Sequence, residues 1–388
     1  MHMKPFEPTR LPVENVDWPR LVRFIGPASR ALAQFNGILY AVRNPDVLLA
    51  PLTIQEAVLS SRIEGTQATL GEVLEFEAGS EPHEEAKRLD IHEILNYRNA
   101  LTLSERRLKG RPFNLNLLLE LHGVLLDSVR GRDKARGQFR KQQNWIGRPG
   151  CSIDEADFVP PNPLVMNEFL DNWEKFYHSE YADLLVQLAL VHAQFEIIHP
   201  FIDGNGRLGR ILIPLFLYER SILSRPVFYL SGYFEQNREA YIDRLRQIGK
   251  EPDAWNGWIE FFLEAVIKQA QQNTATALSI IKLYEKLKMR VLTLTRSQYA
   301  IPLLDVLFEK PVFSTSKLDQ RNGMPSKPMI LRMLNKLRDD GILRVFREAS
   351  GRQSQIMAFP ELINLCEGKN VVTRKRSGHT SFTAVTLG

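Results

Sequence analysis

A run of twelve residues, from His199 to Arg210, gathers the most reactive set of side chains in this sequence: HPFIDGNGRLGR. It holds an imidazole, a carboxylate, several glycines and two guanidinium groups. Apolar residues with a helical period lie before the loop, at 184–198, and again at 207–217. We therefore expect a short polar loop between two buried helices, at the N-terminus of the second helix.

This placement favours the binding of a phosphorylated anion. The first turn of a helix presents unpaired backbone N–H groups and the positive end of the helix dipole. Gly204 and Gly206 allow the backbone to fold into a concave nest of N–H donors. Arg207 and Arg210 are three residues apart, so both guanidinium groups lie on one helix face and can bind more than one phosphate.

The same run offers a base and a metal ligand. His199 can accept a proton near neutral pH, and the Asp203 carboxylate is a hard oxygen ligand that suits Mg²⁺. Together with a phosphate cradle, these groups predict transfer of a nucleotide's phosphorus group to a hydroxyl. An EF-hand is excluded because Leu208 occupies the position of its glycine, and a Walker loop because no Gly-Lys-Ser/Thr follows.

The run is similar, at every fixed position, to the signature of the Fic family, His-x-Phe-x-Asp/Glu-Gly-Asn-Gly-Arg-x-x-Arg. The resemblance implies an all-α fold, with a Fic-type helical core that transfers AMP from ATP to a Ser, Thr or Tyr hydroxyl of a target protein. By the same resemblance His199 is the catalytic base, Asp203 binds Mg²⁺ and Phe201 seats the loop on the core.

The resemblance also assigns the phosphates of ATP to the start of the second helix. Three backbone units are expected to form the anion hole: Gly204, Asn205 and Gly206. Arg207 is expected to contact the β-phosphate and Arg210 the γ-phosphate. A branch of the family that transfers phosphate itself has Lys at the position of Gly206, so the glycine favours AMP transfer.

A second segment, SSRIEG at 60–65, resembles the family's inhibitory motif, Ser/Thr-x-x-x-Glu-Gly/Asn. The resemblance implies that Ser60, Glu64 and Gly65 end an inhibitory helix, whose Glu64 carboxylate pairs with Arg210 and so misaligns the α-phosphate of bound ATP. The alternative is an ordinary helix end with Gly65 after the last turn and a solvated Glu64. Relatives with this motif can also remove AMP, and the sequence leaves addition, removal and both open.

Two further regions are assigned by the resemblance. Extended segments between 136 and 161 predict a two-stranded hairpin, at the distance where Fic proteins carry a flap that adds a strand to the target. A hairpin that only covers the core is the alternative. Leu230, Tyr233 and Asn237 lie where relatives line the adenine, although an aromatic cluster of this kind is equally well explained as core.

Amphipathic patterns predict the helices that hold these segments. Thr53 and Asn114 are the expected N-caps of two of them, and the proline-rich residues 1–28 are expected to be irregular. His192, on an apolar helix, is expected to be a core residue. The predicted helices cover residues 29–40, 53–63, 87–108, 114–129 and 255–288.

The pattern changes from residue 297 onwards. Three short helices, at 299–308, from 314 and at 326–340, are followed by a hairpin at 341–345 and 355–359, an order that resembles a winged helix-turn-helix domain. Whether this domain contacts nucleic acid or protein is left open. Its basic residues are Lys317, Arg321, Lys327, Arg332, Lys336, Arg344, Arg347 and Arg352.

The chain is thus expected to divide into four parts. They are an N-terminal helical region (1–110, with the inhibitory motif at 60–65), a Fic core (111–290, with the flap at 136–161 and the signature loop at 199–210), a winged-helix domain (291–367) and a disordered tail (368–388).

Composition adds few restrictions. The net charge of +5 permits nucleotide binding without requiring nucleic acid, and no stretch is apolar enough to cross a membrane. Cys151 and Cys366 form no disulfide framework and no signal peptide is evident, so a cytoplasmic location is expected.

We therefore expect a protein adenylyltransferase that is autoinhibited by Glu64 and uses ATP and Mg²⁺, with a homodimer left open. One alternative is an enzyme that removes AMP or acts in both directions. A second is a nucleotide-sensing, DNA-binding regulator, against which His199 argues because sensing needs no base.

Overall fold

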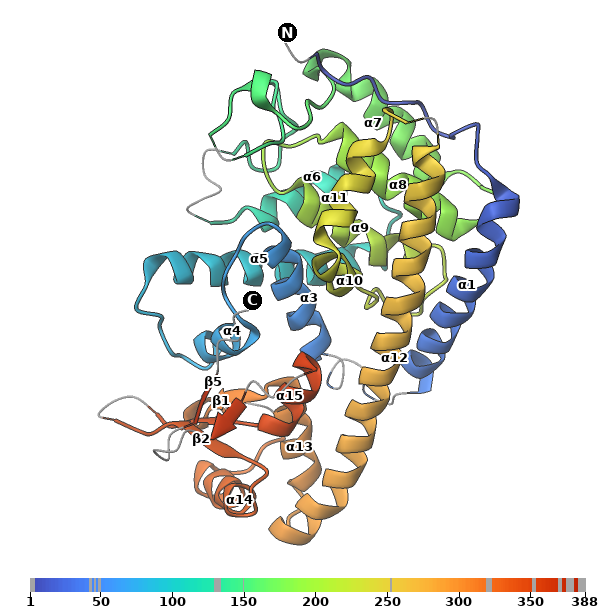
Figure 1. Ribbon diagram of the computed structural model, residues 1–388. Coiled ribbons are helices and arrows are strands. Elements are labelled where there is room, and N and C mark those ends of the chain that lie inside the picture. Colours follow the sequence, from blue (N-terminus) through green and yellow to red (C-terminus); the bar gives the residue numbers. More distant parts are fainter. Residues whose placement is uncertain are drawn as a thin grey trace. The chain divides into compact units, whose positions relative to one another are not determined.

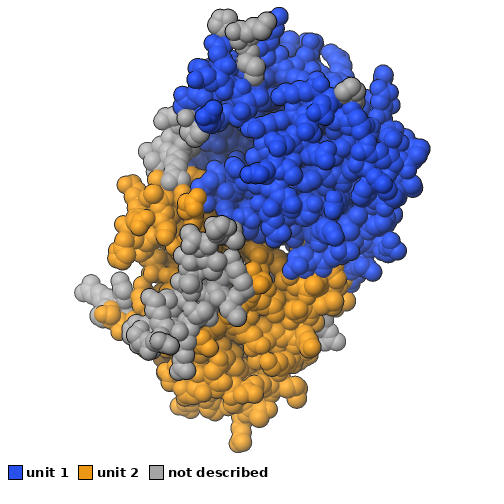
Figure 2. All heavy atoms as spheres, in the orientation of Figure 1, with its two compact units in different colours: residues 1–37, 59–66, 95–272 blue, residues 38–58, 67–94, 273–388 orange. Residues whose placement is uncertain are grey.

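The computed structural model describes residues 4–41, 44, 47, 50–128, 134–148, 150–251, 253–318, 323–350, 354–368, 372–374 and 380–382. These residues are mostly helical, which confirms the expected fold class, and their strands lie in the C-terminal part of the chain (Figure 1). They fall into two compact units (Figure 2). Unit 1 consists of residues 1–37, 59–66 and 95–272, and unit 2 of residues 38–58, 67–94 and 273–388.

Unit 1 contains the signature loop and the two helices that flank it. Its helices, with the 3₁₀ helix η2 (Ile153–Glu155), are α6 (Leu115–Leu125), α7 (Pro163–His178), α8 (Leu184–Ile198), α9 (Asn205–Glu219), α10 (Ser231–Gln236) and α11 (Arg238–Gln247). Four further helices have residues in both units: α1 (Trp18–Ala41), α3 (Ala50–Ile63), α5 (Glu85–Leu108) and α12 (Ala254–Thr295).

Helix α8 is buried along nearly its whole length and ends at the signature loop. Asp183 caps its N-terminus, since its Oδ1 accepts hydrogen bonds of 2.9 Å from the N–H groups of Leu185 and Val186. The indole N–H groups of Trp173 on α7 and Trp258 on α12 donate to α8 carbonyls, both at 2.8 Å. These helices hold α8 in place, so the loop begins from a fixed position.

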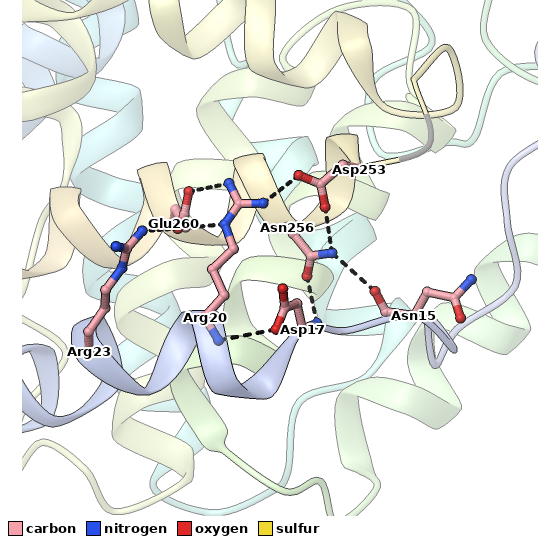
Figure 3. A network of polar contacts seen from close by, with 7 residues as sticks. All are labelled: Asn15, Asp17, Arg20, Arg23, Asp253, Asn256 and Glu260. Atoms are coloured by element: carbon pink, nitrogen blue, oxygen red, sulfur yellow. Dashed lines mark hydrogen bonds and ion pairs between the residues drawn. The ribbon is translucent and has the colours of Figure 1, made fainter.

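A polar network joins the start of α1 to the start of α12 within unit 1 (Figure 3). The Arg20 guanidinium donates to both carboxylate oxygens of Glu260, at 2.8 and 2.6 Å, and also to Asp253. The Asn256 side chain accepts from the N–H of Asp17 at 2.9 Å and donates to the carbonyl of Asn15 at 3.2 Å. The residues before α1 are irregular, as expected, yet hydrogen bonds tie them to the helical core.

Several predicted boundaries are wrong. Helix α1 begins at Trp18, eleven residues before the predicted start at 29, and continues through Pro27. Helix α3 begins at Ala50, so Thr53 is not its N-cap. The Asn114 cap is confirmed, because its Oδ1 accepts from the N–H of Leu117 at 2.9 Å, but α6 ends at Leu125, short of the predicted 129. Tertiary packing, which a local pattern does not record, explains the longer helices.

Unit 2 contains a small antiparallel sheet with strand order β1-β3-β2. Its elements are α4 (Leu70–Glu77), α13 (Ala300–Glu309), β1 (Val312–Ser314), η3 (Thr315–Lys317), α14 (Lys327–Asp339), β2 (Arg344–Arg347), β3 (Ile356–Ala358) and α15 (Pro360–Glu367). The order of α13, α14 and the β2–β3 hairpin agrees with the expectation. The second predicted helix is described only as the 3₁₀ turn η3, and β1, which was not predicted, comes before it.

The C-terminal tail is not wholly irregular. Strands β4 (Val372–Arg374) and β5 (Thr380–Phe382) pair antiparallel, with Val372 opposite Phe382. The prediction of a disordered tail is therefore wrong for these two segments, in which β-branched and aromatic residues favour strand pairing. The rest of 369–388 lies outside the described residues.

No helix in the part of the chain that the structure describes is long and apolar enough to cross a membrane. Cys151 and Cys366 are both free thiols, and burial raises the pKa of Cys366 to about 12.

Candidate functional site

The signature loop is closed by contacts within itself and with α6. Helix α8 ends at Ile198, and its C-cap residue His199 has a left-handed backbone with φ 49°. The Asn205 side chain bonds both the N–H and the carbonyl of Phe201, each at 2.9 Å. The Phe201 ring is fully buried and stacks on His122 of α6 with ring centroids 3.9 Å apart. The loop is therefore a fixed turn on the core.

A buried arginine that the sequence analysis missed fixes the loop from the other side. Arg140 is 2% exposed, and its guanidinium donates to the carbonyls of His199, at 2.9 Å, and Pro161, at 2.6 Å. The backbone N–H of Arg140 donates to the carbonyl of Pro200 at 2.9 Å. Burial lowers the pKa of Arg140 to about 10, so the group keeps its charge at neutral pH.

His199 is set up as a neutral base. Its Nδ1 lies 3.2 Å from the backbone carbonyl of Glu196, and a carbonyl only accepts hydrogen bonds. The proton therefore resides on Nδ1, which leaves the lone pair of Nε2 available. Burial lowers the pKa of His199 to about 4, so the imidazole is uncharged at pH 7.

The start of α9 has the geometry of an anion site. Gly204 precedes the helix with φ 81°, a backbone conformation that favours glycine. A Cβ on Gly206 would lie 2.4 Å from Oε1 of Glu64 and 3.0 Å from Nη1 of Arg210. Glycine at 206 thus lets two charged side chains approach the backbone, and a larger residue there would require the Glu64 carboxylate to move.

The two arginines of the signature are both buried but have different partners. Arg207 is 5% exposed and its Nη2 lies 3.3 Å from Oδ1 of Asp203. Arg210 is 2% exposed, and its Nη2 lies 2.6 Å from Oε1 of Glu64. Arg210 also donates to Ser60, through Nε to Oγ at 2.8 Å and through Nη2 to the carbonyl at 2.9 Å.

The segment 60–65 therefore reaches the signature loop within unit 1. Gly65 has φ 104° and follows the last turn of α3, as expected for a helix end. Burial alone would raise the pKa of Glu64, but the Arg210 guanidinium lowers it below its ordinary value. The carboxylate is thus ionised and paired, in contrast to the alternative of a merely solvated Glu64.

One pocket of about 780 Å³ brings these groups together. Five of the ten residues predicted for the signature loop and the inhibitory motif line it: His199, Asp203, Gly206, Arg210 and Glu64. The other five do not line it: Gly204, Asn205, Arg207, Ser60 and Gly65. The predicted adenine-side residues do not line this pocket. Leu230 is 2% exposed beside α10, and Tyr233 packs on Phe261 at 5.7 Å. Asn237 donates to the carbonyl of Tyr233 at 2.9 Å.

The predicted flap hairpin is reduced to a single bridge. Among the described residues of 136–161, only Ile146 and Phe158 pair, in antiparallel sense, so the prediction of two regular strands is wrong. The N-terminal segment packs against this loop. The backbone N–H of Phe6 donates to the carbonyl of Val159 at 2.8 Å, and the ring centroids of Phe6 and Phe158 lie 5.5 Å apart. Trp145, 42% exposed, lies at the pocket edge.

Glu196 is a pocket residue that the sequence analysis did not single out. Its Oε1 is buried and has no hydrogen-bond partner among the described residues. Burial raises the pKa of Glu196 to about 8, so the carboxyl is mostly protonated at neutral pH. The side chain occupies the space left by Gly209, where a Cβ would lie 2.1 Å from Oε1. The one feature of the sequence that could have indicated a role for Glu196 is its position on the same helix, three residues before His199.

The residues present fit a Mg²⁺ that is bound together with a nucleotide. Asp203 is 45% exposed and lines the pocket, so its carboxylate can supply one hard oxygen ligand. Mg²⁺ is commonly held by one or two carboxylates with substrate phosphates and waters. Within the described ranges, no group of three His, Cys, Asp or Glu side chains could hold a metal ion without such a partner.

The fold and the loop define a class: a helical protein with a glycine-rich turn between two buried helices, and with a carboxylate just after a third helix in the same pocket. Comparison with known families agrees. Residues 22–105 match the model described as Fic/DOC family N-terminal, and residues 112–217 match the Fic/DOC family model. The chain therefore contains a Fic/DOC N-terminal domain followed by a Fic/DOC domain.

Curated relatives match over part of their length. A probable protein adenylyltransferase of Aquifex aeolicus is 37% identical over 95 residues, which are 24% of this chain and 27% of the relative. The protein adenylyltransferase Fic of Drosophila willistoni is 32% identical over 137 residues, 33% of this chain and 25% of the relative. The protein adenylyltransferase Fic of Aedes aegypti is 28% identical over 212 residues, which are 52% of this chain and 38% of the relative. This chain thus spans well under half of these relatives.

Two solved structures share the fold. A Fic family protein from Desulfovibrio desulfuricans has a TM-score of 0.55 at 18% identity, over 92% of this chain and 98% of that one. A Fic domain containing signaling protein from Bacteroides thetaiotaomicron has a TM-score of 0.53 at 18% identity, over 65% of this chain and 97% of its own.

Proposed function

We propose that the protein transfers AMP from ATP to a Ser, Thr or Tyr hydroxyl of a target protein, and that Glu64 inhibits this reaction. The observation that carries the proposal is the pairing of buried Arg210 with Glu64 in the pocket that also contains His199. The names of the curated relatives, each a protein adenylyltransferase or probable protein adenylyltransferase, support the same reaction.

The geometry supports an in-line transfer. The acceptor hydroxyl oxygen attacks the α-phosphorus while Nε2 of His199 takes its proton, and the bond to the bridging oxygen of pyrophosphate breaks. The N–H groups at the start of α9 stabilise the charge on the phosphates. Arg207 and Arg210 hold the β- and γ-phosphates, and Mg²⁺ held by Asp203 would supply charge neutralisation.

Inhibition follows from competition for one guanidinium. Glu64 occupies the Nη2 group of Arg210 that a γ-phosphate needs. While the pair is intact, a bound triphosphate is displaced from in-line alignment. Release of α3 or replacement of Glu64 frees Arg210.

The same carboxylate favours a second activity at this site. Glu64 is ionised and faces the pocket that holds His199, so it can take a proton from a water that attacks an AMP ester. Removal of AMP would then need Glu64, whereas addition would be inhibited by it. Release of AMP from a modified target by the wild type, but not by Glu64→Gln, distinguishes the two directions.

The experiment that tests the proposed reaction uses ATP labelled in two positions. The Glu64→Gly variant is incubated with Mg²⁺, a cell lysate and ATP labelled on the α- or the γ-phosphorus. We expect protein-bound label that depends on His199, meaning label lost when His199→Ala is added to the variant, from the α-position only. Label from the γ-position that depends on His199 would instead show phosphate transfer by this protein, and no His199-dependent label from either position would contradict the proposal.

Unit 2 has a second candidate role, contact with nucleic acid. Helix α14, which takes the place of the third helix of a winged-helix domain, exposes Lys327, Arg332 and Lys336. Arg321 and Arg352 lie outside the described residues. Salt-dependent binding of duplex DNA, lost in Arg332→Ala, would support this role.

The two free thiols fit a reducing compartment such as the cytoplasm.

A further inference from the structure

A short chain of hydrogen bonds runs behind the phosphate pocket of unit 1. His192 lies on α8 and is fully buried. Its Nδ1 is 3.0 Å from the backbone carbonyl of Gly209, and its Nε2 is 3.0 Å from the hydroxyl of Tyr241 on α11. His192 is thus the core residue that its sequence position predicts, and it also joins α8, α9 and α11.

The direction of these hydrogen bonds is fixed by chemistry. The Gly209 carbonyl can only accept, so Nδ1 of His192 carries the ring proton. Burial lowers the pKa of His192 to about 3, so the ring has no second proton at neutral pH. Nε2 must therefore accept, and the Tyr241 hydroxyl must donate to it. Only the lone pairs of that hydroxyl remain for other neighbours.

The Tyr241 hydroxyl and the Arg210 guanidinium line the same pocket. Burial and the Glu196 carboxyl raise the pKa of Tyr241, and the positive charge of Arg210 opposes that rise. A guanidinium can only donate, and a hydroxyl whose proton is already given to His192 can only accept. The two groups are therefore matched by the orientation that His192 imposes.

We propose that Tyr241 is a positioning residue, whose hydroxyl, oriented by His192, keeps the Arg210 guanidinium directed at the phosphate pocket when Glu64 leaves it. This inference rests on the proposed function. Tyr241 lies on α11, whereas Ser60 and Glu64 lie on or beside α3, so Tyr241 does not depend on the inhibitory segment. A nucleotide that displaces Glu64 then meets a guanidinium that is already oriented.

The experiment compares the binding of two nucleotides, because Arg210 is assigned to the γ-phosphate. Binding of the α,β-methylene analogues of ATP and ADP, which cannot release pyrophosphate or phosphate at that bond, is measured by calorimetry with Mg²⁺. The parent is Glu64→Gly, and the test variant carries Tyr241→Phe as well. We expect affinity for the ATP analogue to fall about tenfold, as for loss of a hydrogen bond to a charged group, with affinity for the ADP analogue unchanged.

A matched control removes a hydroxyl elsewhere in unit 1. Tyr177 is also fully buried, and its hydroxyl donates to Glu219 at 3.0 Å, but it does not line the pocket. Tyr177→Phe should leave both affinities unchanged. If Tyr241→Phe folds poorly, His192→Phe serves as the second variant, since it frees the hydroxyl to turn and should lower the ATP preference in the same direction.

The outcomes separate this inference from the proposed function. Equal weakening of both analogues by Tyr241→Phe, or an unchanged ATP preference, would overturn the positioning role alone. A parent that binds neither analogue, or binds both equally, would contradict the assignment of Arg210 to the γ-phosphate and with it the proposed function.

Discussion

The carboxylate of Glu64 lies 2.6 Å from Nη2 of Arg210, although 146 positions separate the two residues in the chain. The exposure of the pair is unequal, since the Glu64 side chain is 39% exposed and that of Arg210 only 2%. Glu64 can therefore move into solvent while Arg210 stays in place. The anion of a nucleotide would replace one charge partner of Arg210 with another, without leaving a buried charge unpaired.

Ser60 should contribute to stability through its bond to Arg210. In Ser60→Ala the guanidinium loses the Oγ acceptor at 2.8 Å, and we expect a loss of about 1–2 kcal/mol in the free energy of unfolding. Ser61→Ala is the matched control, because Ser61 is equally buried and its Oγ has no partner in the described structure. Denaturant unfolding of both variants gives the comparison, and equal stability of the two would contradict the role of Ser60.

The contiguous parts of the site were predictable from the sequence. The signature fixes the types and spacing of His199, Asp203 and Arg210, and the motif at 60–65 predicted the pairing of Glu64 with Arg210. Local patterns also located α8, α9 and the Asn114 cap. Their signals lie within a few residues of one another, which is the range over which periodicity and capping act.

The missed residues act through contacts that no local pattern contains. Arg140 and Tyr241 gain their roles from acceptors and donors on distant elements, so neither has a sequence signature. The flap was predicted as a hairpin because its segments are extended, but among its described residues only Ile146 and Phe158 form a β-bridge. Extended residues form a regular ladder only when two segments lie in register, and the sequence does not specify that register here.

Acid should destabilise the folded protein through its buried histidines. Burial lowers the pKa of His122 and His199 to about 4 and that of His192 to about 3, against an ordinary value of 6.5. Below pH 6.5 the unfolded chain binds protons that the folded chain does not, so stability falls as the pH drops towards 4. Each histidine can contribute up to about 1.4 kcal/mol per pH unit in that window.

The check is unfolding by denaturant between pH 7 and pH 5, where most carboxylates stay ionised. A single substitution, His199→Ala, should reduce the dependence on pH because it removes one of the three groups. Identical slopes for the wild type and the variant would show that His199 is not buried in its neutral form.

Glu196 should make the folded protein less stable as the pH rises, which is opposite to the effect of the buried histidines. Its folded-state pKa is about 8 against an ordinary 4.5, so between these values the folded protein keeps a proton that the unfolded chain loses. Stability from this group therefore falls as the pH rises from 4.5 to 8. Glu196→Gln retains the shape without the titration.

We expect the melting temperature of Glu196→Gln to exceed that of the wild type by a margin that grows from pH 5 to pH 8. Glu174→Gln is the control, because Glu174 is half-buried on α7, accepts from the N–H of Leu115 and does not line the pocket. A margin that stays constant with pH would mean that the Glu196 carboxyl is ionised in the folded protein.

The central claim, that Glu64 restrains AMP transfer by occupying Arg210, is tested most directly by the rate of the reaction. Incorporation of AMP into protein is followed over a range of Mg-ATP for the wild type, Glu64→Gly and Glu64→Gly with His199→Ala. We predict that Glu64→Gly is at least about tenfold faster than the wild type, as expected when an ion pair is removed, and that the double variant is inactive. Equal rates for the wild type and Glu64→Gly at every concentration would contradict the account.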